Sequence, residues 1–256
     1  MAFIDLEVRR LMGKAIHQHA MLEDGDHVTV AVSGGKDSML LLWLLRERLE
    51  RIPIRYTLTA VHVDPGFDTR SGDQLEEFFR REGFDHRVIR TDHGPRAHGP
   101  ENRENPCFLC ARLRRTVLFK TAGALNSRKI AFGHNQDDFA ETFLMNIIYG
   151  AQVSGMLPRQ PFFGGEITII RPLALVPAAK VERLARRLDL PIIASCCPSL
   201  QENKRHEIRE FLGALSRKNP KVRGNICHAM RNVNLEYLPP QVRSEPIKPH
   251  PFQDRT

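Results

Sequence analysis

The sequence predicts a doubly wound α/β fold with a mostly parallel sheet and a small helical C-terminal extension. Short runs of apolar and β-branched residues alternate with amphipathic segments along most of the chain. The short runs are continuously apolar, as expected for parallel strands that are covered on both faces. The chain has 256 residues, enough to bury a sizeable core, and shows no internal repeat.

In the first half of the chain, three strands are predicted. The runs HVTVAV and YTLTAVHVD are rich in valine and threonine, which favour strands, and the segments after them place apolar residues at helical spacing. The predicted elements are a helix over 2–21, a strand over 27–32, a helix over 39–50, a strand over 56–64, a helix over 73–82 and a strand over 86–91.

The second half continues the alternation after a stretch over 92–106, whose glycine, proline and polar residues predict a loop. The same two patterns, helical spacing and short β-branched runs, identify the elements that follow. They are a helix over 108–125, a strand over 129–135, a helix over 137–149, a strand over 166–173, a helix over 178–189 and a last strand over 191–195.

These elements divide the chain into four predicted regions. An N-terminal helix lies within 1–25, and the α/β domain spans 26–200. A helical extension over 201–238 contains two helical segments, 204–221 and 225–233. The tail over 239–256 has five prolines in eighteen residues and is predicted to be disordered or draped over the domain.

Composition and charge restrict the class of protein. Charged residues interrupt the N-terminal apolar residues, unlike a secretory signal, and no run of about 18 apolar residues predicts a membrane span. We therefore expect a cytoplasmic protein with no membrane partner. The net charge of +8 favours a polyanionic partner such as nucleic acid, although a solvated basic surface would give the same value.

A glycine loop follows the first predicted strand. The stretch Ser33–Gly34–Gly35–Lys36–Asp37–Ser38 joins that strand to a helix, where backbone N–H groups, the helix N-terminus and Lys36 would bind an anion. It is not a Walker A motif, because Val30 and Asp37 stand where that motif needs Gly and Ser or Thr. Asp37 would bind Mg²⁺ or cap the helix, since it would repel phosphate. A simple tight turn is the alternative.

Two other predicted strands end near the same edge of the sheet as the glycine loop. In doubly wound sheets, ligands bind beyond the carboxyl ends of the strands. The loop from Ser33, the end of the second strand at Asp64 and the loop from Gly133 are therefore expected to border one site.

The five cysteines of the chain suggest metal or sulfur chemistry. Cys107 and Cys110 form a C-x-x-C pair, and of the adjacent Cys196 and Cys197 only one is expected to join them. Three thiolates with one open position suit a [4Fe–4S] cluster that holds an exogenous ligand. Zinc completed by His134 or water, and three unrelated core cysteines, are the alternatives.

The string SGGKDS resembles the signature of the PP-loop ATP pyrophosphatase superfamily, and GHNQDDFAET (133–142) resembles its second motif. The resemblance implies cleavage of ATP between the α and β phosphates. It also implies that Ser33 to Ser38 cradle the pyrophosphate and that His62, Val63, Asp64 and Gly133 border the nucleotide. Asp137 and Asp138 would bind Mg²⁺ or move a proton; helix-terminal charge is their alternative role.

The order of motifs, with the stretch CFLCARLRRTVLFKTA, resembles the TtcA-like tRNA 2-thiolation enzymes (the tRNA 2-thiocytidine biosynthesis family) over about residues 10–235. This implies an ATP-dependent tRNA sulfurtransferase that adenylates the C2 oxygen of a tRNA base, with sulfide at the open iron displacing AMP. Cys107, Cys110 and Cys197 match the family's ligands, with Cys196 as the rival for the third.

Further partners and residue roles are expected from the chain. The sulfur donor would be sulfide or a cysteine desulfurase, and the apolar helix over 139–149 could form a homodimer. Arg114, four residues after Cys110, is the arginine that we expect to act in catalysis together with Lys36 and Asp37; Arg112 and Arg115 either contact phosphate or form a solvated face.

Other functions remain open from the sequence. A PP-loop iron–sulfur enzyme could sulfurate or desulfurate a small molecule, and a nucleotide-binding metal sensor would bind ATP without releasing pyrophosphate. An amide-forming ligase would not need the cysteines.

Overall fold

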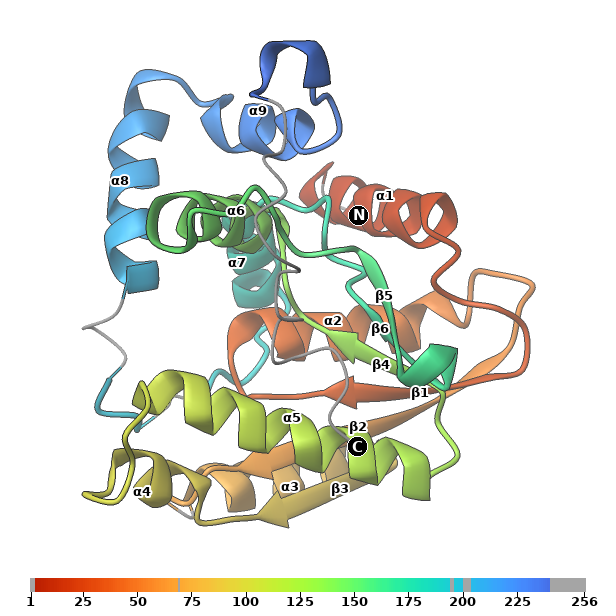
Figure 1. The fold of residues 1–256 in the computed structure, drawn as a ribbon. Helices are drawn as coiled ribbons and strands as arrows, with labels where there is room; N and C mark the ends of the chain where they lie inside the picture. Colours follow the sequence, from red (N-terminus) through yellow and green to blue (C-terminus); the bar gives the residue numbers. More distant parts are fainter. Residues whose placement is uncertain (1–2, 69, 194–195, 200–203, 240–256) are drawn as a thin grey trace.

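A six-stranded sheet forms the centre of the part of the chain that the computed structural model describes, residues 3–68, 70–193, 196–199 and 204–239 (Figure 1). The strand order is β3-β2-β1-β4-β6-β5. All neighbouring strands pair in parallel except β5, which runs antiparallel to β6 at the edge. The strands are β1 (Asp26–Ala31), β2 (Tyr56–Asp64), β3 (His86–Arg90), β4 (Lys129–Phe132), β5 (Arg159–Phe162) and β6 (Ile167–Ile170). The predicted fold class is confirmed.

Helices follow the strands and cover the sheet. They are α1 (Phe3–Gln18), α2 (Lys36–Arg48), α3 (Arg70–Arg81), α4 (His93–His98), α5 (Pro106–Ala124), α6 (Gln136–Gly150), α7 (Ala178–Arg187), α8 (Lys204–Lys218) and α9 (Val222–Ala229), with 3₁₀ turns at Phe163–Gly165 and Leu235–Tyr237. In the described part of the chain, no helix is long and apolar enough to cross a membrane.

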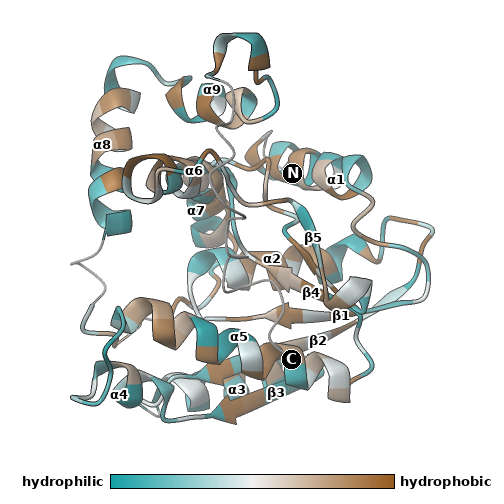
Figure 2. Cartoon of the chain, in the orientation of Figure 1, coloured by the Kyte–Doolittle hydropathy of each residue, from teal (hydrophilic) through white to brown (hydrophobic). Residues whose placement is uncertain are grey.

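One hydrophobic cluster packs on each face of the sheet. The larger one joins α1, α2, α3 and α7 to strand residues such as Val30 and Ala60. On the other face, Val61 and Val63 of β2 pack with Leu118 of α5. The strands in the middle of the molecule and α6 carry mostly hydrophobic colour (Figure 2). Because side chains alternate along β2, neighbouring residues of this strand face different helices.

The C-terminal helices α8 and α9 pack on α6 (Figure 1). Ile208 and Leu212 of α8 form a third apolar cluster with Ala140 of α6. The carboxylate of Glu141, which is 2% exposed, accepts two hydrogen bonds from Arg209 of α8 (2.9 and 3.1 Å). This ion pair between a buried carboxylate and a partly exposed guanidinium fixes where α8 lies relative to the start of α6.

The structure corrects two of the predicted elements. The last strand predicted over 191–195 is wrong for residues 191–193, which lie outside the sheet, since the Ile193 N–H donates to the Gly34 carbonyl (3.0 Å) rather than to a strand. The loop predicted over 92–106 contains the short helix α4. The edge strand β5 was not predicted. The tail beyond residue 239 lies outside the described residues.

Candidate functional site

The loop between β1 and α2 is braced by its own serines. The Ser33 backbone N–H donates to Ser38 Oγ (3.1 Å), and Ser38 Oγ donates to the Gly35 carbonyl (3.0 Å). Gly34 has φ +85°, a conformation that glycine adopts without steric cost, so the chain turns sharply there. Among the described residues, no side chain caps α2, which leaves its first backbone N–H groups for an anion. The loop therefore has the shape and the donors of a phosphate cradle.

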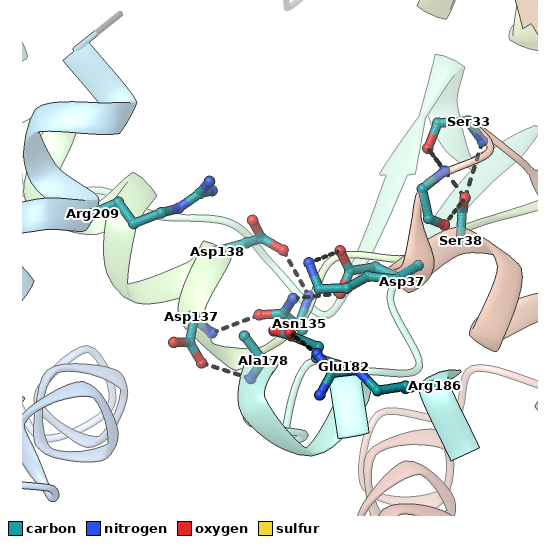
Figure 3. A network of polar contacts seen from close by, with 12 residues as sticks. Ser33, Asp37, Ser38, Asn135, Asp137, Asp138, Ala178, Glu182, Arg186 and Arg209 are labelled. Carbon is teal, nitrogen blue, oxygen red and sulfur yellow. Dashed lines mark hydrogen bonds and ion pairs between the residues drawn. The ribbon is translucent and has the colours of Figure 1, made fainter. Parts of the chain in front are cut away.

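The second motif lies directly against this loop. A Cβ at Gly133 would stand 2.8 Å from the backbone nitrogen of Ser38, so only glycine allows this approach. The Asn135 side chain donates to Asp37 Oδ1 (3.0 Å) and accepts from the backbone N–H of Asp137 (2.9 Å), as Figure 3 shows. One asparagine thus caps α6 and fixes a carboxylate on α2.

Asp137 is a link between helices. Its Oδ1 accepts from the backbone N–H of Ala178 at the start of α7 (2.9 Å), a contact visible in Figure 3. Its Oδ2 pairs with Arg223 of α9 (3.0 Å). Both carboxylate oxygens are therefore engaged by the surrounding helices.

Asp138 has a different environment, because it lines the cavity described next. Its Oδ2 accepts from the Asn135 backbone N–H (2.9 Å), and its Oδ1 lies 3.4 Å from Arg205 Nη1. Burial raises the pKa of the Asp138 carboxyl, and the negative charges of Glu141 and Asp37 raise it further. Two carboxylates from two motifs therefore stand close together at the cavity wall.

A cavity of about 370 Å³ lies between α5 and the carboxyl ends of β1, β2 and β4. Its walls combine apolar strand residues, the glycine loop, the start of α6 and basic side chains from α5 and α8. The lining residues are Ala31, Val32, Ser33, Asp37, Ser38, Val61, Val63, Ala111, Arg114, Arg115, Leu118, Phe132, Gly133, His134, Asp138 and Arg205. The cavity occupies the position where doubly wound sheets bind ligands.

Three arginines give this cavity a positive wall: Arg114 and Arg115 from α5 and Arg205 from α8. The Nε of Arg114 is buried with no hydrogen-bond partner among the described residues. Burial lowers the pKa of Arg115. Buried cations are costly unless an opposite charge or hydrogen bonds compensate them, so the cavity suits an anionic ligand.

His134 lines the same cavity as a neutral ring. Arg171 Nε donates to His134 Nδ1 (3.3 Å), and Arg171 Nη1 donates to the Leu157 carbonyl (2.6 Å). Burial, together with the positive charge of Arg171, lowers the pKa of His134 to about 3. Because Nδ1 accepts, the proton of the neutral ring is on Nε2. His134 therefore offers the site a hydrogen-bond donor without a charge.

Three cysteines come together at the start of α5. Burial raises the pKa of the Cys107 and Cys110 thiols, and the proximity of Cys197 raises both further. Cys196 makes a different contact, because its Sγ donates to Asp68 Oδ2 (3.8 Å). The five cysteines of the chain, all within the described residues, form no disulfide. Among the described residues, no group of three or more His, Cys, Asp or Glu side chains is arranged to hold a metal ion.

Arg114 connects the cysteines to the cavity. It stands four residues after Cys110 on α5 and therefore on the same face of the helix. Its positive charge opposes the rise in the pKa of the Cys110 thiol that burial causes. Since Arg114 also lines the cavity, the cavity and the cysteines share one wall.

The residues expected at the nucleotide fall into three groups. Five of them line the cavity: Ser33, Asp37, Ser38, Val63 and Gly133. Gly34, Gly35 and Lys36 belong to the loop beside it, with Lys36 Nζ 3.6 Å from Asp37 Oδ2. The side chains of His62 and Asp64 point to the other face of the sheet, where a Cβ at Gly72 of α3 would stand 2.8 Å from Asp64 Oδ2.

Sequence reasoning missed two residues of the site, Asn135 and Arg205. Asn135 could have been found, because an N-cap residue three positions before an acidic residue is a capping-box pattern. Arg205 has no local signal, since its place depends on how α8 packs on α6. Of the two other arginines considered on α5, Arg115 lines the cavity, whereas Arg112 pairs with Glu104 at the surface (3.1 Å).

Known proteins resemble this chain over most of its length. Residues 6–214 match a family described as "PP-loop domain". The tRNA-cytidine(32) 2-sulfurtransferase of Geotalea uraniireducens is 36% identical over 234 residues, which cover 90% of this chain and 93% of that protein. The protein of the same name from Syntrophotalea carbinolica is 38% identical over 238 residues, 91% of each chain.

A solved structure is also similar. The U34-tRNA thiolase NcsA from Methanococcus maripaludis with its [4Fe-4S] cluster has a TM-score of 0.77 to this chain at 26% sequence identity. The match covers 92% of this chain and 80% of that one.

Proposed function

Because the chain belongs to the PP-loop family, and within it to the group of the tRNA-cytidine(32) 2-sulfurtransferases, we propose that it is an ATP-dependent tRNA sulfurtransferase. The reaction would replace the C2 oxygen of a cytidine in tRNA by sulfur, with cytidine 32 as the position that the names of the relatives suggest. ATP would leave as AMP and pyrophosphate.

One observation carries this proposal: Arg114 lines the cavity and also lies beside Cys110. The reaction first activates an oxygen with ATP and then exchanges it for sulfur. The nucleotide site and the cysteine site must therefore both reach the same carbon atom of the base. A shared wall supports this, because activation and exchange can then occur without release of the activated base.

The glycine loop and the cationic wall are suited to the nucleotide. Backbone N–H groups at the start of α2 and the ammonium of Lys36 would bind the phosphates that become pyrophosphate. Arg114, Arg115 and Arg205 would neutralise charge that develops on the phosphates in the transition state. Fixed positive groups of this kind make AMP a good leaving group.

Asp37 and Asp138 are the residues that would hold Mg²⁺. Carboxylate oxygens are its preferred protein ligands, and the two carboxylates face one cavity from different helices. A bound divalent cation would also relieve their mutual repulsion, which contributes to the raised pKa of the Asp138 carboxyl. Asp137, engaged by Ala178 and Arg223, would support the helices rather than the metal.

Cys107, Cys110 and Cys197 are the residues that would hold a [4Fe–4S] cluster, because Cys197 is near enough to both thiols of the C-x-x-C pair to raise their pKa. When bound, such a cluster would supply an iron with an open coordination position for sulfide. The chain itself would supply the thiolates, with Arg114 favouring the charged form of Cys110. Cys196, in contact with Asp68, would not be a ligand.

The tRNA base must leave its stack to reach the cavity, so an unpaired loop is the suitable substrate region. The net charge of +8 supports binding of the tRNA backbone. Free sulfide or a cysteine desulfurase would provide the sulfur.

Exposed apolar residues at the end of α6 and after it, among them Ile148 (53% exposed) and Val153 (66%), support a homodimer.

The experiment that tests the function is reconstitution without oxygen. Purified protein is loaded with iron and sulfide and given ATP, Mg²⁺, sulfide and tRNA that lacks 2-thiocytidine; nucleosides are then analysed by mass spectrometry. We expect 2-thiocytidine together with AMP and pyrophosphate. Lys36→Ala should abolish both products, whereas Cys110→Ala should lose the thionucleoside and keep nucleotide binding. An iron-free protein that leaves the tRNA unchanged would contradict the proposal.

A further inference from the structure

Residues 196–199, here termed the third-cysteine segment, are held at both ends by side chains from other parts of the fold. At one end, Cys196 Sγ donates to Asp68 Oδ2 (3.8 Å) in the connection after β2. At the other end, Ser199 Oγ lies 2.8 Å from His98 Nε2 on α4. Cys197 lies between these two anchors. Its direction toward Cys107 and Cys110 therefore depends on contacts outside the segment.

His98 is fixed in one orientation and one tautomer. Its Nδ1 is 3.0 Å from the Gly94 carbonyl, an acceptor only, so Nδ1 must carry the proton. On the other side of the ring, His98 Nε2 is 2.8 Å from Ser199 Oγ, within hydrogen-bond distance. The ring also packs edge-on against Phe67, with the centroids 5.2 Å apart. Backbone, ring and hydroxyl together leave His98 little freedom to move.

Ser199 continues this chain of contacts to the C-x-x-C helix, because its side chain is hydrogen-bonded to the Cys107 thiol. One hydroxyl thus touches α4 through His98 and α5 through Cys107. The contact joins the segment that carries one predicted cluster ligand to the helix that carries the other two.

We propose that His98 and Ser199 are positioning residues that clasp the third-cysteine segment against α5 and so hold Cys197 opposite Cys107 and Cys110. The inference rests on the proposed function for its purpose, since the three cysteines are assembled to bind a cluster. The geometry of the clasp is a property of the chain alone. Groups that orient metal ligands in this way lie outside the ligand set and act through it.

The first test measures thiol accessibility in the metal-free protein. Ser199→Val removes the hydroxyl, Ser199→Thr keeps it with the same branched shape, and His98→Phe keeps a ring against Phe67 without nitrogen atoms. Arg96→Ala, which removes an exposed side chain of α4 that pairs with Asp92 (3.7 Å), serves as control. Alkylation of Cys197 by iodoacetamide is followed by peptide mass spectrometry under native conditions.

In the Ser199→Val and His98→Phe variants, iodoacetamide should alkylate Cys197 roughly fivefold faster than in the native chain. This is the factor expected for the loss of one net hydrogen bond. Ser199→Thr and Arg96→Ala should keep the native rate. Equal rates for the valine and threonine variants would overturn the clasp, because the hydroxyl would then have no role. Circular dichroism confirms that each variant is folded before its rate is used.

The second test measures iron and sulfide per chain, and the visible absorption, after anaerobic reconstitution. The valine variant should bind less iron than the threonine variant. If the native chain binds no iron, the proposed function fails and the clasp is decided by the alkylation rates. If the native chain binds iron and both variants of Ser199 load equally, the clasp is contradicted while the function stands.

Discussion

The side chain of Asn135 donates a hydrogen bond to Asp37 Oδ1 at 3.0 Å, although the two residues are 98 positions apart in the chain. This contact joins the two nucleotide motifs. It holds the carboxylate of Asp37 toward the cavity while the same asparagine caps α6 through its Oδ1. Asn135 therefore has two functions, capping α6 and anchoring the Asp37 carboxylate, and substitutions can distinguish them.

Asn135→Ser should keep the helix cap and lose the bond to Asp37, whereas Asn135→Ala should lose both. We expect the serine variant to remain within about 0.5 kcal/mol of native stability and the alanine variant to lose about 1 kcal/mol. Pyrophosphate release should fall by roughly tenfold in both, because a misplaced carboxylate binds Mg²⁺ poorly. Urea unfolding and a pyrophosphate assay measure the two effects; full activity of the serine variant would refute the anchoring role.

Asp138→Asn and Asp137→Asn form a matched pair at neighbouring positions. The Asp138 variant should lose about 100-fold in activity with little loss of stability, because its carboxylate faces the cavity. The Asp137 variant should lose about 1–2 kcal/mol of stability through the weakened contact to Arg223, with a smaller loss of activity. Activity titrated with Mg²⁺ and denaturant curves are the measurements. Similar activity losses in both variants would argue against the division of roles.

Stability should fall in acid because of His134. Its folded pKa of about 3 lies below the ordinary histidine value of 6.5, so below pH 6.5 the unfolded chain binds a proton that the folded chain does not. This stabilising contribution is fully present above pH 6.5 and is lost progressively as the pH falls toward 3. The difference in unfolding free energy between the native chain and His134→Gln should shrink by about 2 kcal/mol from pH 7 to pH 5. A difference that does not change with pH would contradict the neutral ring.

The Glu141–Arg209 pair should control the cavity from a distance, since it fixes α8, which carries Arg205 into the wall. Arg209→Met should destabilise the protein by about 1–2 kcal/mol, less than for a fully buried pair because the Arg209 side chain is 56% exposed. We expect the KM for ATP to rise several-fold. Arg217→Met, at the other end of α8, is the control, and an equal KM in the two variants would exclude this coupling.

The sheet and its main helices were predictable because their patterns are local. Strand β2 has the bounds that the apolar run YTLTAVHVD predicts. Strand β5 escaped prediction because Pro161 cannot donate a backbone hydrogen bond and is tolerated here only at the edge of the sheet. The apolar run at 191–193 misled the prediction, since Ile193 bonds to the glycine loop instead of a strand. Helix α4 was hidden by Gly94 and Pro95, which lower helix propensity.

The site was predictable where a motif is contiguous. The glycine loop, the C-x-x-C pair and Gly133 follow from short strings and from the rule that ligands bind beyond the carboxyl ends of parallel strands. The different surroundings of Asp137 and Asp138 depend on α7 and α9, which no string reveals. Arg205 and the contact of His98 with Ser199 depend in the same way on tertiary packing between distant segments.

We propose that the nucleotide in the cavity and an iron–sulfur cluster on the neighbouring cysteines lie on the two sides of one wall, with Arg114 between them. The most direct measurement is a crystal structure of the reconstituted protein, grown without oxygen and with a non-hydrolysable ATP analogue. We predict phosphates between Ser33 and Arg114, with a cluster on Cys107, Cys110 and Cys197 opening toward them. A nucleotide bound elsewhere, or a metal held by these cysteines that faces away from Arg114, would contradict the account.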